Sequence, residues 1–190
     1  MSTSLSRRDF LRIVGGTTSA GLIFLLLKPK SVSAGILPPG ALAGSDFSAI
    51  CLRCGKCTAV CEQQAIQIDA QGFPYIDGMS GWCNFSADCV EACPSGALQP
   101  FEPETVKIAT AVIDRDRCIA WNSTGCRLCY RKCSDLYDAI WIEPDGIFLR
   151  PHIDETRCNG CGACVNVCPR AATPGGSTTR GKAVSLRPLG

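Results

Sequence analysis

The chemistry of this 190-residue chain lies in 15 cysteines, which form four closely spaced runs. The first and fourth runs have the spacing C-x2-C-x2-C-x3-C, which is typical of bacterial iron–sulfur proteins. The third run lengthens the first gap to seven residues, and the second has a serine in place of one cysteine. The runs are Cys51, Cys54, Cys57 and Cys61; Cys83, Cys89 and Cys93; Cys118, Cys126, Cys129 and Cys133; and Cys158, Cys161, Cys164 and Cys168. Together they predict an electron-transfer protein with several iron–sulfur clusters.

The runs are expected to work in pairs, because in two-cluster ferredoxins the fourth cysteine of one run ligates the other cluster. Three predicted ligand sets are complete. These are Cys51, Cys54, Cys57 and Cys93 (the first set); Cys118, Cys126, Cys129 and Cys168 (the third set); and Cys158, Cys161, Cys164 and Cys133 (the fourth set). The second set has Cys61, Cys83 and Cys89, with Ser86 where a fourth thiolate is missing.

Ser86 decides what the second set can hold. A 3Fe-4S cluster, a 4Fe-4S cluster with the Ser86 alkoxide or water on its fourth iron, and an empty site are the alternatives, since an oxygen ligand is harder than a thiolate. Asp88 lies nearby but at the wrong position in the frame. The three remaining cysteines favour an occupied site. We therefore expect three 4Fe-4S clusters and a fourth that is 3Fe-4S or an incompletely cysteine-ligated 4Fe-4S cluster.

Two other uses of cysteine compete with this interpretation. Disulfides suit an exported protein, but an odd number of cysteines cannot all pair, and the short spacing within a run gives poor bridging geometry. Structural zinc uses C-x2-C pairs separated by a longer loop, whereas here further cysteines follow at once. The single histidine, His152, lies outside every run. Iron–sulfur clusters remain the favoured cofactor.

Short elements must position the cysteines, and they occur in two copies. Alternating strands around a turn follow Cys61 and Cys133, and they predict hairpins over 65–77 and 139–154, the second with its turn at 144–146. Short helices are expected at 58–64 and 165–170, and strands at 106–114 and 183–187. The predicted fold class is α+β: two tandem bacterial ferredoxin-like modules, each of the type with two 4Fe-4S clusters, with short hairpins and short helices around the clusters.

The predicted organisation has four parts. Residues 1–34 form a signal peptide, 35–46 a Pro/Gly-rich leader, 47–104 the first module and 105–190 the second. Each module is too small to build much of an apolar core. Cluster binding is therefore expected to supply part of the folding free energy.

The N-terminus predicts export in the folded state. Arg7 and Arg8 precede Phe10-Leu11, an apolar stretch runs from 13 to 27, and a small-residue cleavage site ends at Ala34. This pattern is typical of the twin-arginine route, which moves folded proteins and suits clusters inserted in the reducing cytoplasm. A periplasmic protein is expected, and an uncleaved membrane anchor is the alternative.

Charge and motifs exclude other functions. The formal net charge is +2, and much of the basic excess lies in residues 1–34, so no basic stripe remains for nucleic acid. The sequence has no triad, phosphate-binding loop or paired catalytic carboxylates. A carrier without a substrate site of its own is the expectation.

The chain resembles the MauM/NapG family of exported ferredoxin-type proteins. The twin-arginine start, the segment Leu37-Pro38-Pro39-Gly40-Ala41 and the stretched third run carry the resemblance. Such proteins are thought to carry four cubane clusters on the ligand sets given above. The resemblance implies electron relay from a membrane quinol dehydrogenase (NapH-like) towards a periplasmic reductase, other redox enzyme or cytochrome, with peripheral membrane association. In NapG's case the terminal enzyme is nitrate reductase.

Three functional hypotheses follow. The first is a periplasmic electron relay that connects the quinol-oxidising partner with a periplasmic reductase or dehydrogenase system. The second is the electron-transfer subunit of a larger oxidoreductase, for example a molybdenum enzyme. The third is an assembly or scaffolding factor whose clusters are structural. A stable stoichiometric complex favours the second hypothesis, and clusters that react with neither partner favour the third.

Overall fold

The computed structural model describes residues 35–123, 125–169 and 181–189, all within one compact unit. The predicted signal peptide therefore lies outside the described residues. Among those that are described, no helix is long and apolar enough to cross a membrane.

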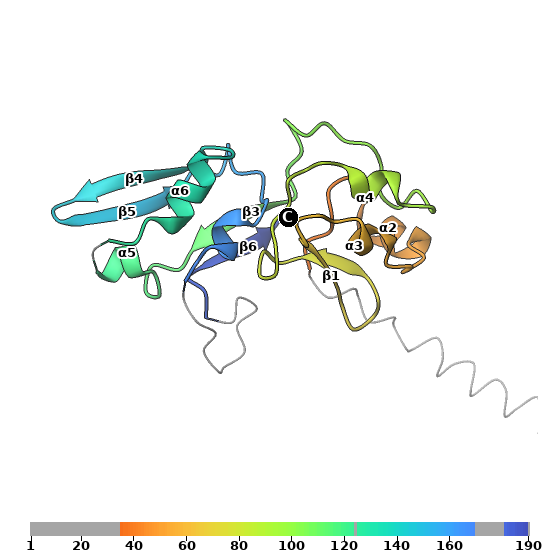
Figure 1. Ribbon diagram of the computed structural model, residues 1–190, viewed down its shortest axis with the longest axis horizontal. Helices are drawn as coiled ribbons and strands as arrows, with labels where there is room; N and C mark the ends of the chain where they lie inside the picture. Colours follow the sequence, from red (N-terminus) through yellow and green to blue (C-terminus); the bar gives the residue numbers. More distant parts are fainter. Residues whose placement is uncertain (1–34, 124, 170–180, 190) are drawn as a thin grey trace, which may run out of the picture. The chain divides into compact units, whose positions relative to one another are not determined.

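Short helices and three two-stranded sheets make up the fold (Figure 1). The helices are α2 (Gly44–Ile50), α3 (Lys56–Ala59), α4 (Asp88–Glu91), α5 (Ile119–Asn122), α6 (Leu128–Ser134) and α7 (Ala163–Asn166). The strands are β1 (Ile66–Ile68), β2 (Pro74–Ile76), β3 (Ala109–Ile113), β4 (Ile140–Asp145), β5 (Phe148–Ile153) and β6 (Val184–Pro188). Short helices with small sheets agree with the predicted α+β class.

Both predicted hairpins are confirmed. β1 pairs antiparallel with β2, and β4 pairs with β5. The predicted position of the second turn, at 144–146, is partly wrong, because strand pairing continues to Asp145 opposite Phe148. The turn therefore consists of Gly146 and Ile147, and Gly146 has φ 59°, the left-handed conformation that glycine tolerates best.

The strands expected at the two ends of the second module are also confirmed, and they pair with each other. β3 and β6 run antiparallel, with Ile113 opposite Val184. In the first module the leader, residues 35–46, pairs with later segments through isolated antiparallel bridges from Ile36 to Ile76 and from Ala41 to Leu98. The predicted leader boundary at 46/47 falls inside α2, and the boundary at 104/105 falls in a turn.

The predicted helices at 58–64 and 165–170 are misplaced. α3 and α7 each form a single turn and begin two residues earlier than expected, directly after the left-handed residues Gly55 (φ 71°) and Gly162 (φ 84°). A left-handed residue fixes where the helix starts. Pro169 then follows the fourth run and cannot continue a helix. The third cysteine of each run therefore lies inside the helix.

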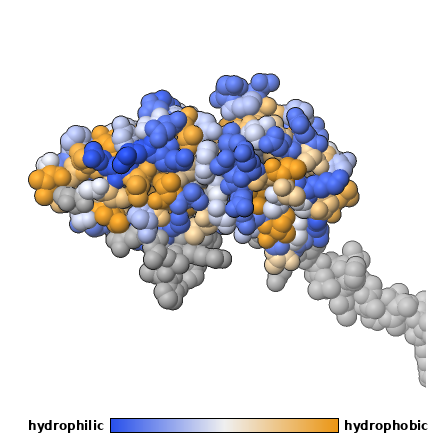
Figure 2. All heavy atoms as spheres, viewed as in Figure 1, coloured by the Kyte–Doolittle hydropathy of each residue, from blue (hydrophilic) through white to orange (hydrophobic). Residues whose placement is uncertain are grey.

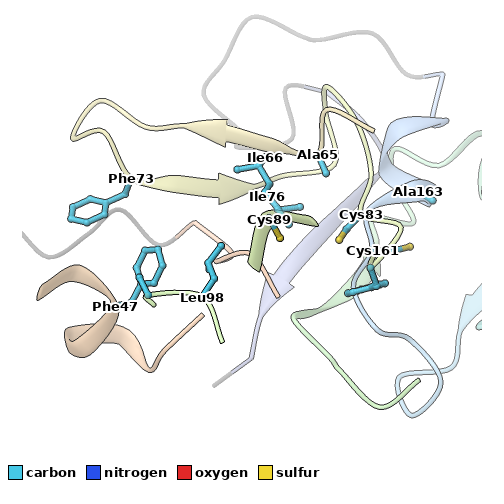
Figure 3. Packing of buried hydrophobic residues seen from close by; sticks show 12 residues of the cluster. Phe47, Ala65, Ile66, Phe73, Ile76, Cys83, Cys89, Leu98, Cys161 and Ala163 are labelled. Atoms are coloured by element: carbon cyan, nitrogen blue, oxygen red, sulfur yellow. The ribbon is translucent and has the colours of Figure 1, made fainter. Parts of the chain in front are cut away.

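The core is built partly from sulfur. A first cluster of buried side chains includes Phe47, Ile66 and Ile76, and Figure 3 shows it with the thiols of Cys83, Cys89 and Cys161 among the apolar groups. The cysteines classed as buried are Cys83, Cys89, Cys118, Cys129, Cys133, Cys158, Cys161 and Cys164. The modules thus place polar thiols where larger domains place aliphatic side chains.

Hairpin β4–β5 carries a stack of aromatic rings. His152 lies within β5, and its ring is 4.4 Å from that of Trp141 and 5.3 Å from that of Trp121. The indole of Trp121 donates to the carbonyl of Pro151. At the turn Ile147 is 76% exposed, and Figure 2 shows apolar surface at that end of the hairpin.

Candidate iron–sulfur sites

The first predicted set surrounds one cavity. The thiols of Cys51, Cys54, Cys57 and Cys93 all line it, and Phe47 and Leu98 contribute to its apolar wall. Cys54 is exposed, and the other three cysteines are half-buried. The run supplies three thiols from one loop, and the fourth thiol comes from the end of α4.

The third and fourth sets have the same arrangement. One cavity is lined by Cys118, Cys126, Cys129 and Cys168, and another by Cys133, Cys158, Cys161 and Cys164. The three cavities enclose similar empty space, about 390, 340 and 310 Å³ for the first, fourth and third sets, including space open to solvent. Because four thiols surround each cavity and the cavities are similar in size, all three suit the same kind of cofactor.

The donors fit an iron–sulfur cluster. All 15 cysteines are free thiols, and backbone N–H groups point at several sulfurs. Ala65 donates to Cys61 at 3.3 Å and Ala139 to Cys133 at 3.3 Å, while Ala111 and Ala183 donate to Cys158 and Cys168 at 3.4 Å. Such hydrogen bonds favour the thiolate, which is the form that binds iron.

Burial opposes these hydrogen bonds, because it favours the neutral thiol and raises the thiol pKa. Desolvation, with neighbouring thiols as a further cause, raises the pKa of Cys83, Cys129 and Cys161 to about 12, and the pKa of the fully buried Cys164 is also raised. Thiolates gathered in an apolar cavity repel one another unless a cation lies between them. Iron supplies that charge.

The second set is also brought together. Cys83 faces Cys89 and Cys61, since both add to the rise in its pKa after burial. The loop of this run has Phe85 at φ 57° and Ala87 at φ 67°. The first run has the same left-handed pair at Arg53 and Gly55, and the fourth run has it at Gly160 and Gly162. The second run therefore keeps the loop conformation of the first and fourth runs, although a left-handed conformation is costly for Phe and Ala.

A side-chain contact places Ser86 within this loop. The Asn84 carboxamide oxygen accepts the backbone N–H of Ser86 at 3.3 Å, just as Asn159 accepts that of Cys161 at 3.1 Å. Ser86 thus occupies the loop position that Cys161 holds in the fourth run. Its hydroxyl is exposed and donates to the Asp88 carboxylate at 2.7 Å. The carboxylate that is out of frame in the sequence therefore holds the serine side chain.

A repeated aspartate turn was missed by the sequence reasoning. Asp114 accepts the N–H groups of Asp116 and Arg117, and its carbonyl accepts that of Cys118. Asp154 does the same for Thr156, Arg157 and Cys158. The Thr156 hydroxyl also donates to its carboxylate, and this hydrogen bond, with those from the N–H groups of Thr156 and Arg157, lowers the pKa of the carboxyl group. The spacing Asp-x3-Cys before the third and fourth runs was the signal that identifies these turns.

Neighbouring sets touch one another. Cys89 of the second set lies near Cys57 of the first, and Cys164 of the fourth lies near Cys129 of the third. Between the modules, the N–H of Cys83 donates to the carbonyl of Cys161 at 2.8 Å. Contacts therefore link the first set to the second, the second to the fourth and the fourth to the third.

Tyr137 lies at the contact between the modules, with its ring edge-on to that of Phe85. Burial raises its pKa to about 12, and the nearby thiols of Cys161 and Cys83 add to that rise. The Asn159 side chain near its hydroxyl acts in the opposite direction on this pKa. One tyrosine thus adjoins thiols of two different sets.

Comparison with known proteins gives two family matches. Residues 50–97 and residues 111–173 each match a family model described as a 4Fe-4S dicluster domain. Each match spans two of the cysteine runs. No solved structure matches the chain.

Several curated proteins are similar over most of the chain. The methylamine utilization ferredoxin-type protein MauM of Methylobacillus flagellatus is 31% identical, over 88% of this chain and 77% of the relative. The ferredoxin-type protein NapG of Escherichia coli is 30% identical, over 85% of this chain and 78% of the relative. The ferredoxin-type protein NapF of the same species is 33% identical, over 75% of this chain and 85% of the relative.

Proposed function

The chain belongs to the MauM and NapG family of ferredoxin-type iron–sulfur proteins, and from that premise we propose that it is an exported electron relay. It takes electrons from a membrane quinol dehydrogenase of the NapH kind and passes them towards a periplasmic redox enzyme or cytochrome. It has no substrate site of its own. The reaction that finally consumes the electrons belongs to the partners.

The observation that carries the proposal is the grouping of the thiols. Three predicted quartets each line one apolar cavity, and the four cysteines of each quartet fall within one matched dicluster domain. A 4Fe-4S cluster supplies reversible one-electron chemistry. The chain holds it with thiolates, excludes water with apolar walls and tunes its potential with N–H groups directed at sulfur.

The second set holds a fourth cluster, of the 3Fe-4S type or with a non-cysteine ligand on its fourth iron. Cys83 and Cys89 belong to the first buried cluster and Cys61 packs against it, and the loop keeps the conformation of the first and fourth runs. That conformation places left-handed Phe85 and Ala87 around Ser86, a cost that an unused loop has no reason to retain. Ser86 is exposed, so water also reaches this corner.

The quinol-side donor is tested with loaded protein purified under anaerobic conditions. Membranes from the source organism and a reduced quinol are added, and bleaching of the visible iron–sulfur absorbance is followed. The relay predicts bleaching that requires both the membranes and the quinol. Protein that dithionite reduces reversibly but that never responds to quinol and membranes contradicts this donor.

Export is tested separately with the predicted signal. Arg7→Lys with Arg8→Lys is expected to retain loaded protein in the cytoplasm, because the twin-arginine route requires that pair. Arg12→Lys is the matched control and is expected to leave export unchanged. Cell fractionation followed by immunoblotting measures the distribution. Periplasmic protein from the double variant in the same amount as from the native chain contradicts the export route.

A further inference from the structure

The two modules meet at the cysteines themselves. Cys83 belongs to the second set and Cys161 to the fourth, and the N–H of the former donates to the carbonyl of the latter at 2.8 Å. Both residues are 8% exposed. Figure 3 shows Cys83 beside Cys161, with Ala163 of α7 close by. A ligand of one module is thus bonded directly to a ligand of the other.

The surrounding contacts hold this junction closed. Phe85 meets Tyr137 edge-on, with 6.0 Å between ring centroids, and the Lys132 ammonium lies 4.7 Å from the Trp82 ring. The backbones of the modules also approach so closely that a Cβ on Gly78 would lie 2.9 Å from the Gly162 carbonyl oxygen. Ring contacts and this close backbone approach together fix the distance between the modules.

We propose that the four sets form one electron path in the order first, second, fourth, third, and that the Cys83–Cys161 contact is its step between the modules. This inference rests on the proposed function and deepens it, because it places the incomplete second set inside the path. Packing supplies the steps within the modules: Cys57 packs against the first buried cluster, which includes Cys89, and Cys129 and Cys164 both belong to the second.

Transfer across the junction moves one electron and nothing else. The site that gives up the electron is oxidised by one electron and its neighbour is reduced by one, with no bond made or broken and no proton moved. The electron enters from the quinol-side partner and leaves to the periplasmic redox partner. The hydrogen bond shortens the through-bond route between the two sulfurs, because the N–H and the carbonyl belong to the ligand residues themselves.

Exposure differs between the sets. The exposed Cys54 is in the first set, and the third set includes the half-buried Cys126 and Cys168. In the second set Cys83 and Cys89 are buried, but Cys61 is half-buried and Ser86 is exposed. The four cysteines of the fourth set are all buried, so this set is covered by protein, as a position inside the path requires.

Tyr137 is a positioning residue of this junction. The Asn159 side chain lies near its hydroxyl and accepts the N–H of Cys161 at 3.1 Å. Tyr137→Phe keeps the ring against Phe85 but removes the hydroxyl beside this carboxamide. We expect a changed hydrogen-bond environment at the fourth set, and a shift at the second set through Cys83, with the first and third sets unaffected.

The test is an EPR-monitored redox titration of the full loaded chain. Tyr137→Phe is expected to shift two of the reduction potentials and leave the others unchanged, at native iron content. Tyr75→Phe makes the same change in β2, opposite Gln67 in the first hairpin, and is the matched control that is expected to leave all the potentials unchanged. Iron-loaded Tyr137→Phe protein with native potentials, or with shifts in every couple, overturns the junction. Native protein that lacks iron and sulfide overturns the proposed function instead.

A second variant tests the spacing of the modules. Gly78→Ala forces the backbones apart, whereas Gly146→Ala introduces the same change at another positive φ where nothing lies within 4 Å of the new Cβ. In the reduced protein, Gly78→Ala is expected to weaken the magnetic interaction between neighbouring clusters, so that EPR signals saturate at lower microwave power. Gly146→Ala is expected to saturate as the native protein does. Loaded Gly78→Ala with native saturation contradicts the path.

Discussion

At the scale of single residues, Ser86 differs from the cysteine at the equivalent loop position by one atom, oxygen in place of sulfur. The loop holds its backbone N–H as it holds that of Cys161, through an asparagine side chain. The hydroxyl turns to Asp88. The difference at this corner is therefore in ligand chemistry rather than in chain geometry.

Ser86→Cys is expected to complete the second set. If the native set holds a three-iron cluster, iron rises from about 15 to about 16 per chain and the oxidised-state EPR signal of three-iron type disappears. The loop of the second run needs no rearrangement, because it already has the backbone conformation of the first and fourth runs. Iron analysis with EPR of the oxidised protein is the measurement. A cysteine variant with native iron and an unchanged three-iron signal contradicts this expectation.

Ser86→Ala asks whether the hydroxyl itself is a ligand. Water reaches this exposed corner, and the hydroxyl donates to Asp88, so we expect native iron content and an unchanged EPR signal. Asp88→Asn is the companion variant, because it keeps the side-chain shape and removes the carboxylate. Loss of iron from Ser86→Ala but not from Asp88→Asn would identify the serine oxygen as a ligand.

At the scale of elements, the one-turn helices α3, α4 and α7 each begin directly after a left-handed residue that ends the preceding loop. The first and fourth runs use Gly55 and Gly162 there, but the second uses Ala87 with φ 67°. Ala87→Gly is expected to raise the stability of the loaded protein by about 1 kcal/mol, because alanine is strained in this conformation. Anaerobic denaturant unfolding measures the change.

Ala59→Gly is the control for that prediction. Ala59 lies inside α3, where glycine costs about 1 kcal/mol relative to alanine. The two substitutions are chemically identical and should move the unfolding midpoint in opposite directions. A midpoint lowered by both variants would show that the Ala87 conformation is not strained.

The hairpins, the strands that close the second module and the cysteine runs were predictable because each has a strong local pattern. The positions of the one-turn helices were not, since they depend on left-handed residues such as Gly55, whose φ the sequence pattern does not state. The bonding of Asp88 to Ser86 and the place of Tyr137 between two modules were also missed. Both depend on contacts that spacing along the chain does not encode.

At the scale of the whole molecule, the cysteines are part of the core that holds each module together. Removal of iron with a chelator under anaerobic conditions is therefore expected to unfold most of the chain, because thiols with a pKa near 12 gain nothing from their cavities without a cation. Circular dichroism and NMR dispersion measure the loss. An iron-free chain that keeps its hairpins and still shows a cooperative unfolding transition would contradict this account of the core.

The central claim is that the grouped thiols hold iron–sulfur clusters that carry electrons. Iron and acid-labile sulfide counts on anaerobically purified protein, with EPR before and after dithionite reduction, test it most directly. The account predicts about 15 or 16 irons per chain, with reversible reduction and EPR signals from more than one cluster. Zinc or disulfides in place of iron, with no signal in either state, would contradict it.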